Sequence, residues 1–207
     1  MKNFTKSQAG FTLIEVMVVI AITLTLSSIL LFYNRSNERQ IVLFKERAVM
    51  LGTLNQAKAL AIQKFLDAES RSCAFGVHFW YDANGSQQFV LFQDMKPGAP
   101  LQINILCRDA VTGDFLNDFI YSAAEGETLN TVTLDQNYEF RVYDSGEAQI
   151  LDDVDVLFIP PDPQATSTGY FLPIRVEIRP RGSGAVTREQ ITSIFISTAG
   201  QITTDNY

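Results

Sequence analysis

One carboxylate stands alone near the start of a long apolar stretch. Glu15 is the only ionisable residue between Phe11 and Tyr33. A charged side chain at the centre of a bilayer costs at least ~2.5 kcal/mol on insertion scales. A residue with that cost indicates a function, so we expect a partner that compensates the charge of Glu15.

The apolar stretch has the length of a membrane span. As a helix, residues 11–33 would extend over roughly 34 Å, which covers a bilayer core. A buried helix of a soluble domain is the alternative, but such helices are rarely apolar over this length. Lys2 and Lys6 precede the stretch. By the positive-inside rule, we expect a single pass with the N-terminus in the cytoplasm and the chain after Tyr33 outside.

The segments around Gly10 are in a different order from those of a secretory signal peptide. Such a signal places its small-residue cleavage site after the apolar stretch. Here the small residue Gly10 lies before that stretch, directly after the basic segment 1–9. Cleavage after Gly10 would therefore leave the hydrophobic helix attached to the mature protein.

The segment Gly10-Phe11-Thr12-Leu13-Ile14-Glu15-Val16 resembles the prepilin signature of type IV pilins and type II secretion pseudopilins. The resemblance implies that prepilin peptidase removes a leader, residues 1–10, by cutting between Gly10 and Phe11, and that Phe11 is then N-methylated. It implies a subunit that is held in inner-membrane lipid and then built, through an inner-membrane assembly platform, into a periplasmic or extracellular filament with itself or other pilins. The resemblance covers only the N-terminal part of the chain.

Cleavage would give Glu15 a partner. Phe11 would carry a new α-amino group at the start of the helix, where the macrodipole also favours a carboxylate. In a low-dielectric filament core, Glu15 of one subunit can neutralise the Phe11 amine of its neighbour, because a buried charge pair is tolerated where one charge alone is penalised. We therefore expect Glu15 to set the axial register of assembly. A polar residue that snorkels to the lipid headgroups is the alternative.

Residues 34–66 are predicted to continue the helix as an amphipathic segment. After the polar segment 34–40, apolar residues recur at spacings of three and four. These are Phe44, Ala48, Leu51, Leu54, Ala61, Ile62 and Phe65. We predict a single helix of about 55 residues whose outer half packs on a globular head at 67–207. A membrane anchor followed by an independent second helix is the alternative.

The hydrophobic period changes to two after Arg71. Apolar residues at 75, 77, 79 and 81, turn residues at 82–85 and a second apolar run at 88–92 predict a β-hairpin. Further strands are predicted at 101–107, 128–134, 138–143, 154–159, 171–178 and 191–197. One helix followed by many short strands favours an α+β fold, with an antiparallel sheet laid against the helix. This order is also loosely similar to that of H-type minor pseudopilins, with further likeness at 157–160 and 194–202.

The two cysteines, Cys73 and Cys107, both lie in the predicted exported head. In such a domain an even pair favours one disulfide, which closes a loop of about 34 residues and contributes on the order of 3–4 kcal/mol. Two separate buried thiols are the alternative. No metal-ligand spacing competes with the disulfide.

Catalysis is not expected. The only histidine, His78, falls on the non-core face of a predicted strand, so we interpret it as a surface residue and not a general base. There is no phosphate loop, dinucleotide fingerprint or zinc-protease motif, and we predict no cofactor and no metal. The acidic segments 144–147 and 152–155 could offer oxygens to calcium, but acidic surface turns are favoured.

The distribution of charge raises a second possible function, which is DNA binding. The net charge of −7 argues against a general nucleic-acid-binding protein. Positive charge does gather near the C-terminus, at Arg175, Arg179, Arg181 and Arg188. Some minor pilins bind DNA for uptake with C-terminal arginines, so a DNA-binding minor pilin is the alternative to a purely structural subunit. An enzyme or receptor that merely uses a membrane anchor is a third possibility.

Overall fold

The computed structural model places the chain in two compact units, residues 1–42 and 43–207, and each is described by itself. The structure describes residues 11–65, 72–81, 87–95, 119–150, 153–159, 164–168, 172–182 and 191–205. Helix α1 (Leu13–Phe65) contributes to both units. No glycine or proline occurs between Phe11 and Leu51, which removes the two residue types that weaken helices most.

The part of α1 in the first unit exposes apolar side chains on all sides. The large apolar residues from Phe11 to Ile29 are between 49% and 83% exposed. Within the described residues, no helix has the combined length and hydropathy of a membrane span.

The second unit contains two antiparallel sheets of five strands each among the described residues. Sheet A has the order β3-β2-β1-β6-β7. Its strands are β1 (Ser72–Tyr81), β2 (Gln87–Met95), β3 (Thr128–Thr133), β6 (Val154–Ile159) and β7 (Gln164–Ser167). Sheet C has the order β10-β9-β8-β4-β5. Its strands are β4 (Tyr138–Tyr143), β5 (Gln149–Ile150), β8 (Ile174–Pro180), β9 (Thr192–Ile196) and β10 (Ile202–Asp205).

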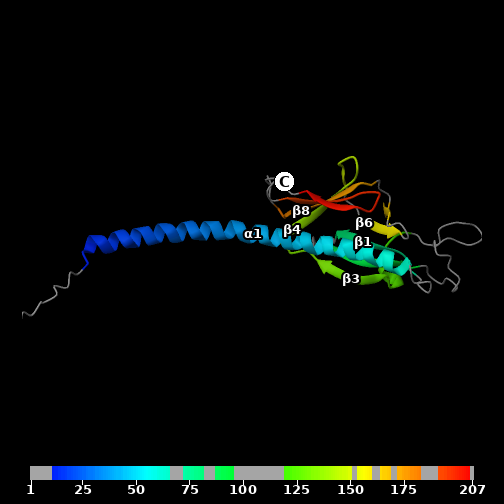
Figure 1. The fold of residues 1–207 in the computed structure, drawn as a ribbon, viewed down its shortest axis with the longest axis horizontal. Coiled ribbons are helices and arrows are strands. Elements are labelled where there is room, and N and C mark those ends of the chain that lie inside the picture. The colour runs from blue at the N-terminus through cyan, green and yellow to red at the C-terminus, as the bar shows by residue number, and fades with distance from the viewer. Residues whose placement is uncertain are drawn as a thin grey trace, which may run out of the picture. The chain divides into compact units, whose positions relative to one another are not determined.

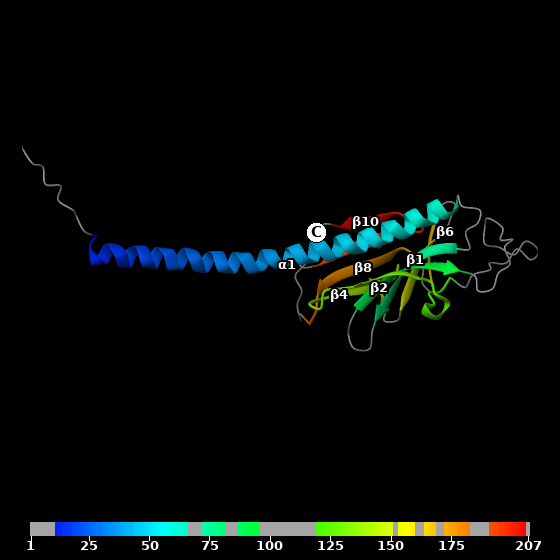
Figure 2. The same ribbon diagram turned by 90° about the horizontal axis from the view of Figure 1, so that it is seen from below.

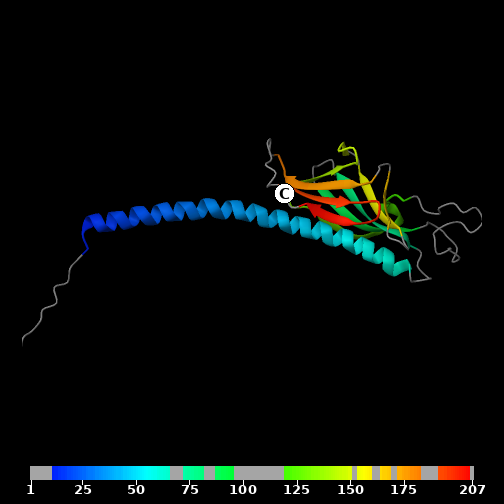
Figure 3. The same ribbon diagram turned by 45° about the horizontal axis from the view of Figure 1, so that its top comes forward.

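The core of the head lies between the inner faces of the two sheets. The rings of Phe79 on β1 and Phe140 on β4 meet edge to face, with centroids 5.4 Å apart. The segment 43–65 of α1 packs along the sheets, as Figures 1 to 3 show from three directions. Its buried stripe contains Leu43, Met50, Leu54, Ala57 and Ala61.

Two hydrogen bonds join this segment of α1 to sheet C. Arg47 Nη1 donates to Thr192 Oγ1 on β9 at 3.3 Å, and Lys58 Nζ donates to the carbonyl of Gly200, before β10, at 2.9 Å. The charged ends of the Arg47 and Lys58 side chains therefore bind beside the packed apolar stripe. These bonds help to fix the rotation of the helix about its own axis on the head.

The predicted α+β class, with an N-terminal helix and antiparallel sheets, is confirmed. The hairpin pairs β1 and β2 in antiparallel register from Ser72↔Met95 to Tyr81↔Gln87. Strands β3, β4, β6, β8 and β9 lie within two or three residues of the predicted positions. The predicted strand 101–107 and the turn 82–85 lie outside the described residues.

Three short strands were not predicted: β5, β7 and β10. β7 follows the proline-rich segment 160–163, whose composition indicates a loop. β5 has two residues, and β10 alternates between exposed and half-buried side chains. Each is an edge strand, so pairing with a longer neighbour stabilises it more than its own hydrophobic pattern does.

The side-chain amide of Gln87 connects the two sheets. Its Nε2 donates to the carbonyl of Phe140 at 3.2 Å, and the N–H of Phe140 donates to its Oε1. On β4, the partner strand β5 reaches only Val142 and Tyr143. The side-chain amide of Gln87 thus makes the two hydrogen bonds to the Phe140 backbone that a neighbouring strand would otherwise make.

We expect Gln87→Leu to lower the free energy of unfolding by about 2–4 kcal/mol, because it removes both hydrogen bonds from buried backbone groups. Denaturant unfolding of the full chain in detergent micelles measures this. Gln88→Leu, on the opposite face of the same strand, is the matched control and should change stability by less than ~1 kcal/mol. Equal effects of the two substitutions would contradict the bridging role of Gln87.

Candidate functional site

The N-terminal residues singled out by the sequence lie at the start of α1. Gly10 is outside the described residues, and Phe11 is 83% exposed just before the helix. The N–H of Glu15 donates to Thr12 Oγ1 at 3.3 Å and to the Thr12 carbonyl at 3.1 Å. Thr12 is therefore the N-cap, and Glu15 lies in the first turn, where the helix dipole favours its charge.

Thr12 is a functional residue that the sequence interpretation missed. A threonine followed three residues later by a glutamate is the capping-box pattern, so the signal was present at Thr12 and Glu15. The cap fixes where the helix begins. It leaves Phe11 as the residue directly before the helix, at the predicted cleavage site.

Hydroxyl groups farther along this helix bond to its own backbone. Thr23 donates to the carbonyls of Val19 and Ile20 at 3.0 and 2.9 Å. Thr25 and Ser27 make the same kind of bond to the preceding turn, at 2.7–3.1 Å. These three hydroxyls are satisfied within the helix, so they are compatible with apolar surroundings.

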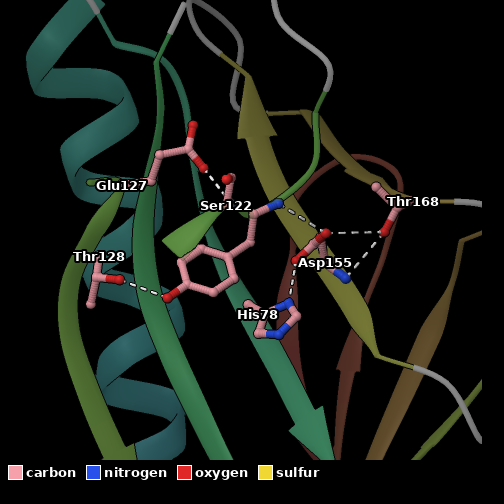
Figure 4. Close-up of polar contacts among 7 residues, drawn as sticks. His78, Ser122, Glu127, Thr128, Asp155 and Thr168 are labelled. Atoms are coloured by element: carbon pink, nitrogen blue, oxygen red, sulfur yellow. Dashed lines mark hydrogen bonds and ion pairs between the residues drawn. The ribbon is translucent and has the colours of Figure 1, made fainter. Parts of the chain in front are cut away.

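His78 is not a surface residue, so that prediction is wrong. It is 8% exposed, and its Nδ1 lies 2.7 Å from Asp155 Oδ1 on β6, within the cluster drawn in Figure 4. The ring of Tyr121 covers it, with centroids 4.6 Å apart. Tyr121 lies more than forty residues after His78 in the sequence. The alternation of apolar residues around His78 therefore could not predict that this ring covers it.

Asp155 collects the polar contacts of this cluster. Its Oδ2 accepts from the N–H of Tyr121 at 3.2 Å and from Thr168 Oγ1 at 3.4 Å. Since a carboxylate only accepts, Nδ1 of His78 carries the proton in their hydrogen bond. The described contacts place no serine or threonine hydroxyl and no cysteine thiol on His78, and the described residues contain no group of three or more potential metal ligands. The cluster therefore joins four segments of the head, those that carry His78, Tyr121, Asp155 and Thr168.

Of the two cysteines, Cys73 lies among the residues that the structure describes. Cys73 is 3% exposed on β1, and Cys107 lies outside the described residues. Their disulfide stays a prediction.

Arg175 and Arg179, two of the arginines in the predicted DNA-binding group, contact acidic or aromatic side chains. Arg175 Nη1 lies 2.9 Å from Glu177 Oε1, and its guanidinium stacks 4.5 Å from the ring centroid of Tyr143. Arg179 Nε donates to Glu139 Oε1 at 2.7 Å. Burial, together with the charge of Glu177, raises the pKa of Tyr143. This face of sheet C therefore alternates in charge instead of forming a basic patch.

The other two arginines of the group are Arg181 and Arg188. Arg181 is exposed at the turn after β8, where its backbone N–H donates to the Asn137 carbonyl at 2.8 Å. Arg188 lies outside the described residues.

The predicted acidic turn at 144–147 is held by its own carboxylate. Asp144 Oδ1 accepts from the N–H groups of Gly146 and Ala148, both at 2.9 Å. In the second acidic segment, Asp152 lies outside the described residues, whereas Asp155 is buried in the His78 cluster. The two acidic segments thus have different roles.

Comparison with known proteins identifies the N-terminal segment. The model of the prokaryotic N-terminal methylation motif matches residues 5–31. No curated protein and no solved structure matches the chain. The match includes Gly10, Phe11, the capping residue Thr12 and Glu15. Residues 5–31 therefore carry the N-terminal methylation motif, which is the signature of type IV pilins and pseudopilins.

Proposed function

We propose that this chain is a structural subunit, a pilin or pseudopilin, of a filament of the type IV pilus or type II secretion kind. The methylation motif at residues 5–31 carries the proposal. In this proposal prepilin peptidase removes residues 1–10, Phe11 is N-methylated, and an inner-membrane platform assembles the mature chain with itself or with other pilins.

The exposed apolar surface of α1 supports assembly by helix packing. Its large apolar side chains from Phe11 to Ile29 are exposed in the single chain. Full burial of one such side chain contributes about 1.5–3 kcal/mol, so water is an unfavourable final environment for this segment. We propose lipid as its surroundings before assembly and the helices of neighbouring subunits afterwards.

The proposed subunit has four parts. They are the leader 1–10, the membrane and filament-core helix 11–33, its amphipathic continuation 34–66 and the head 67–207. We propose that the helix of the second part continues into the third and that Cys73 and Cys107 form a disulfide in the head. The work of such a subunit is mechanical, without catalytic turnover.

In this proposal, cleavage creates an amine at Phe11 near the Glu15 carboxylate at the start of the same helix, so each subunit presents both groups of the register pair at one end. The amine of Phe11 would lie directly before the capping residue Thr12, and Glu15 occupies the first turn. The Glu15 carboxylate then pairs with the Phe11 amine of a neighbouring subunit. The contacts of Arg175 and Arg179 with glutamates speak against DNA binding as the main function.

The first test of the proposal is processing at Gly10. Gly10→Val should leave the full-length precursor in the membrane, because a branched side chain replaces the small residue next to the bond that is cut. Mass spectrometry of the N-terminus detects residues 1–10 and the methyl group on Phe11. Gly10→Ala is the small-residue control and should still be processed. Normal processing of Gly10→Val would overturn the prepilin assignment.

A further inference from the structure

We propose that Glu46 on α1 pairs with the side-chain ammonium group of Lys45 in a neighbouring copy of this chain. This inference rests on the proposed filament and names a second charged contact within it, on the part of α1 that belongs to the head. Each copy would offer Glu46 to one neighbour and Lys45 to another. Such a head-to-tail contact can repeat without closing, as a filament requires.

Glu46 is a carboxylate on the packed side of α1. It lies between Leu43 and Met50 along the apolar stripe and is 4% exposed. Among the described residues, its carboxylate has one polar contact, the ion pair with Lys45 Nζ of the same chain at 3.8 Å. That distance is longer than a hydrogen bond. The side chain of Lys45 is 71% exposed, so water weakens the pair further.

Other buried carboxylates of the head are compensated within the chain at shorter distances. Asp155 Oδ1 lies 2.7 Å from His78 Nδ1, and Glu177 Oε1 lies 2.9 Å from Arg175 Nη1. A buried charge without such a partner is strongly unfavourable. Glu46 lacks this compensation in the single chain, and a cation from a second copy would supply it.

The carboxylate of Glu46 lies within reach of the surface. The side chain of Lys45 is largely exposed, and its Nζ approaches Glu46 Oε1 to 3.8 Å, so this oxygen lies at the exposed edge of the apolar stripe. A second ammonium group can therefore approach it from outside while the helix stays packed on the head.

The register of the proposed filament brings a lysine to this level. Pairing of Glu15 with the Phe11 amine offsets neighbouring helices by four residues, or about 6 Å along the helix. Counted along α1 with the same offset, Glu46 lies level with position 42 of the neighbour. Lys45 of that neighbour is three residues farther, about 4.5 Å along the helix. The flexible four-carbon stem of lysine can span this difference.

Glu46→Gln should have opposite effects on the single chain and on the filament. The substitution keeps the shape of the side chain and removes its charge. The full chain in detergent micelles should unfold at the wild-type denaturant concentration or a higher one, because the charge has no strong partner there. The amount of subunit in sheared filaments should fall roughly tenfold or more, because the pair between copies is lost.

Glu139→Gln is the matched control, since the partners of Glu139 are within the chain. Its Oε1 lies 2.7 Å from Arg179 Nε and 2.9 Å from Arg141 Nη2. This substitution should lower the denaturant concentration at which the chain unfolds and leave the amount of subunit in filaments unchanged. The inference fails if Glu46→Gln gives the wild-type amount of filament, or if it destabilises the single chain as much as Glu139→Gln does.

Carbodiimide cross-linking of assembled filaments identifies the partner, because the reagent joins a carboxylate directly to an amine in contact with it. Wild-type filaments should give covalent oligomers in which mass spectrometry finds Glu46 joined to Lys45 of another copy. Lys45→Arg keeps the positive charge but offers no amine, so it should assemble normally and lose this link. Assembled wild-type filaments without a link between these two residues would refute the choice of partner.

These results are separate from the test of the proposed function. If the wild-type chain forms filaments and Glu46 proves dispensable, only the contact between Glu46 and Lys45 is wrong. If the wild-type chain is neither processed at Gly10 nor found in filaments, the proposed function fails, and this inference fails with it.

Discussion

Glu15→Ala should be cleaved and methylated like the wild type and then fail to enter filaments. In the proposed assembly, the alanine leaves the Phe11 amine of a neighbouring subunit buried without its counter-charge. An uncompensated buried charge costs several kcal/mol, so we expect the amount of subunit in sheared filaments to fall roughly a hundredfold. Immunoblots of sheared and membrane fractions, with mass spectrometry of the N-terminus, measure both steps.

Two matched variants separate charge from helix capping. Glu15→Gln keeps the shape of the side chain and loses its charge, so it should assemble as poorly as Glu15→Ala. Thr12→Ala removes the hydroxyl that accepts from the Glu15 N–H and costs only ~1 kcal/mol of helix stability. It should therefore reduce assembly much less. Normal filaments from Glu15→Gln would exclude a charge pair as the source of register.

Gly76→Ala should prevent the head from folding. A Cβ atom at Gly76 would lie 2.6 Å from the carbonyl oxygen of Val156 and 2.8 Å from Cε1 of Phe92. Gly76 lies in β1, between β2 and β6, so neither the oxygen nor the strand can move without disturbing the sheet. We expect a loss of more than ~4 kcal/mol of unfolding free energy, seen as loss of cooperative unfolding in denaturant.

Gly52→Ala is the control for the loss of a glycine. Gly52 lies in α1, is exposed, and has no atom within 4 Å of an added Cβ. Alanine should therefore stabilise the helix by about 1 kcal/mol. Cooperative unfolding of Gly76→Ala with wild-type stability would show that the sheet adjusts to the added methyl group.

The elements with a strong local pattern could be predicted from the sequence. The hairpin of β1 and β2 alternates clearly, and Phe75, Val77 and Phe79 are buried as the alternation predicts. The α+β class follows from the same change of period. The motif around Gly10 and Glu15 is also local, which is why a short segment sufficed to identify it.

Features that depend on distant segments could not be predicted in this way. The burial of His78 depends on Tyr121 and Asp155, which reach it from other parts of the chain. The amide of Gln87 finds Phe140 only once the two sheets face each other. The compensation of Arg179 depends on Glu139, its neighbour across β4 and β8. In each case a polar side chain acquires its role from tertiary structure.

The hydroxyls of Thr23, Thr25 and Ser27 have a consequence for transfer between solvents. Because they bond to carbonyls of their own helix, these bonds remain the same whether lipid chains or protein side chains surround it. Exchange of one apolar medium for another then requires no new polar partner at these three positions. Within this apolar segment, the charged groups that must change partners are the Glu15 carboxylate and the Phe11 amine, so in the proposed assembly the electrostatic difference between the segment in lipid and the segment in the filament is concentrated at the first turn of one helix.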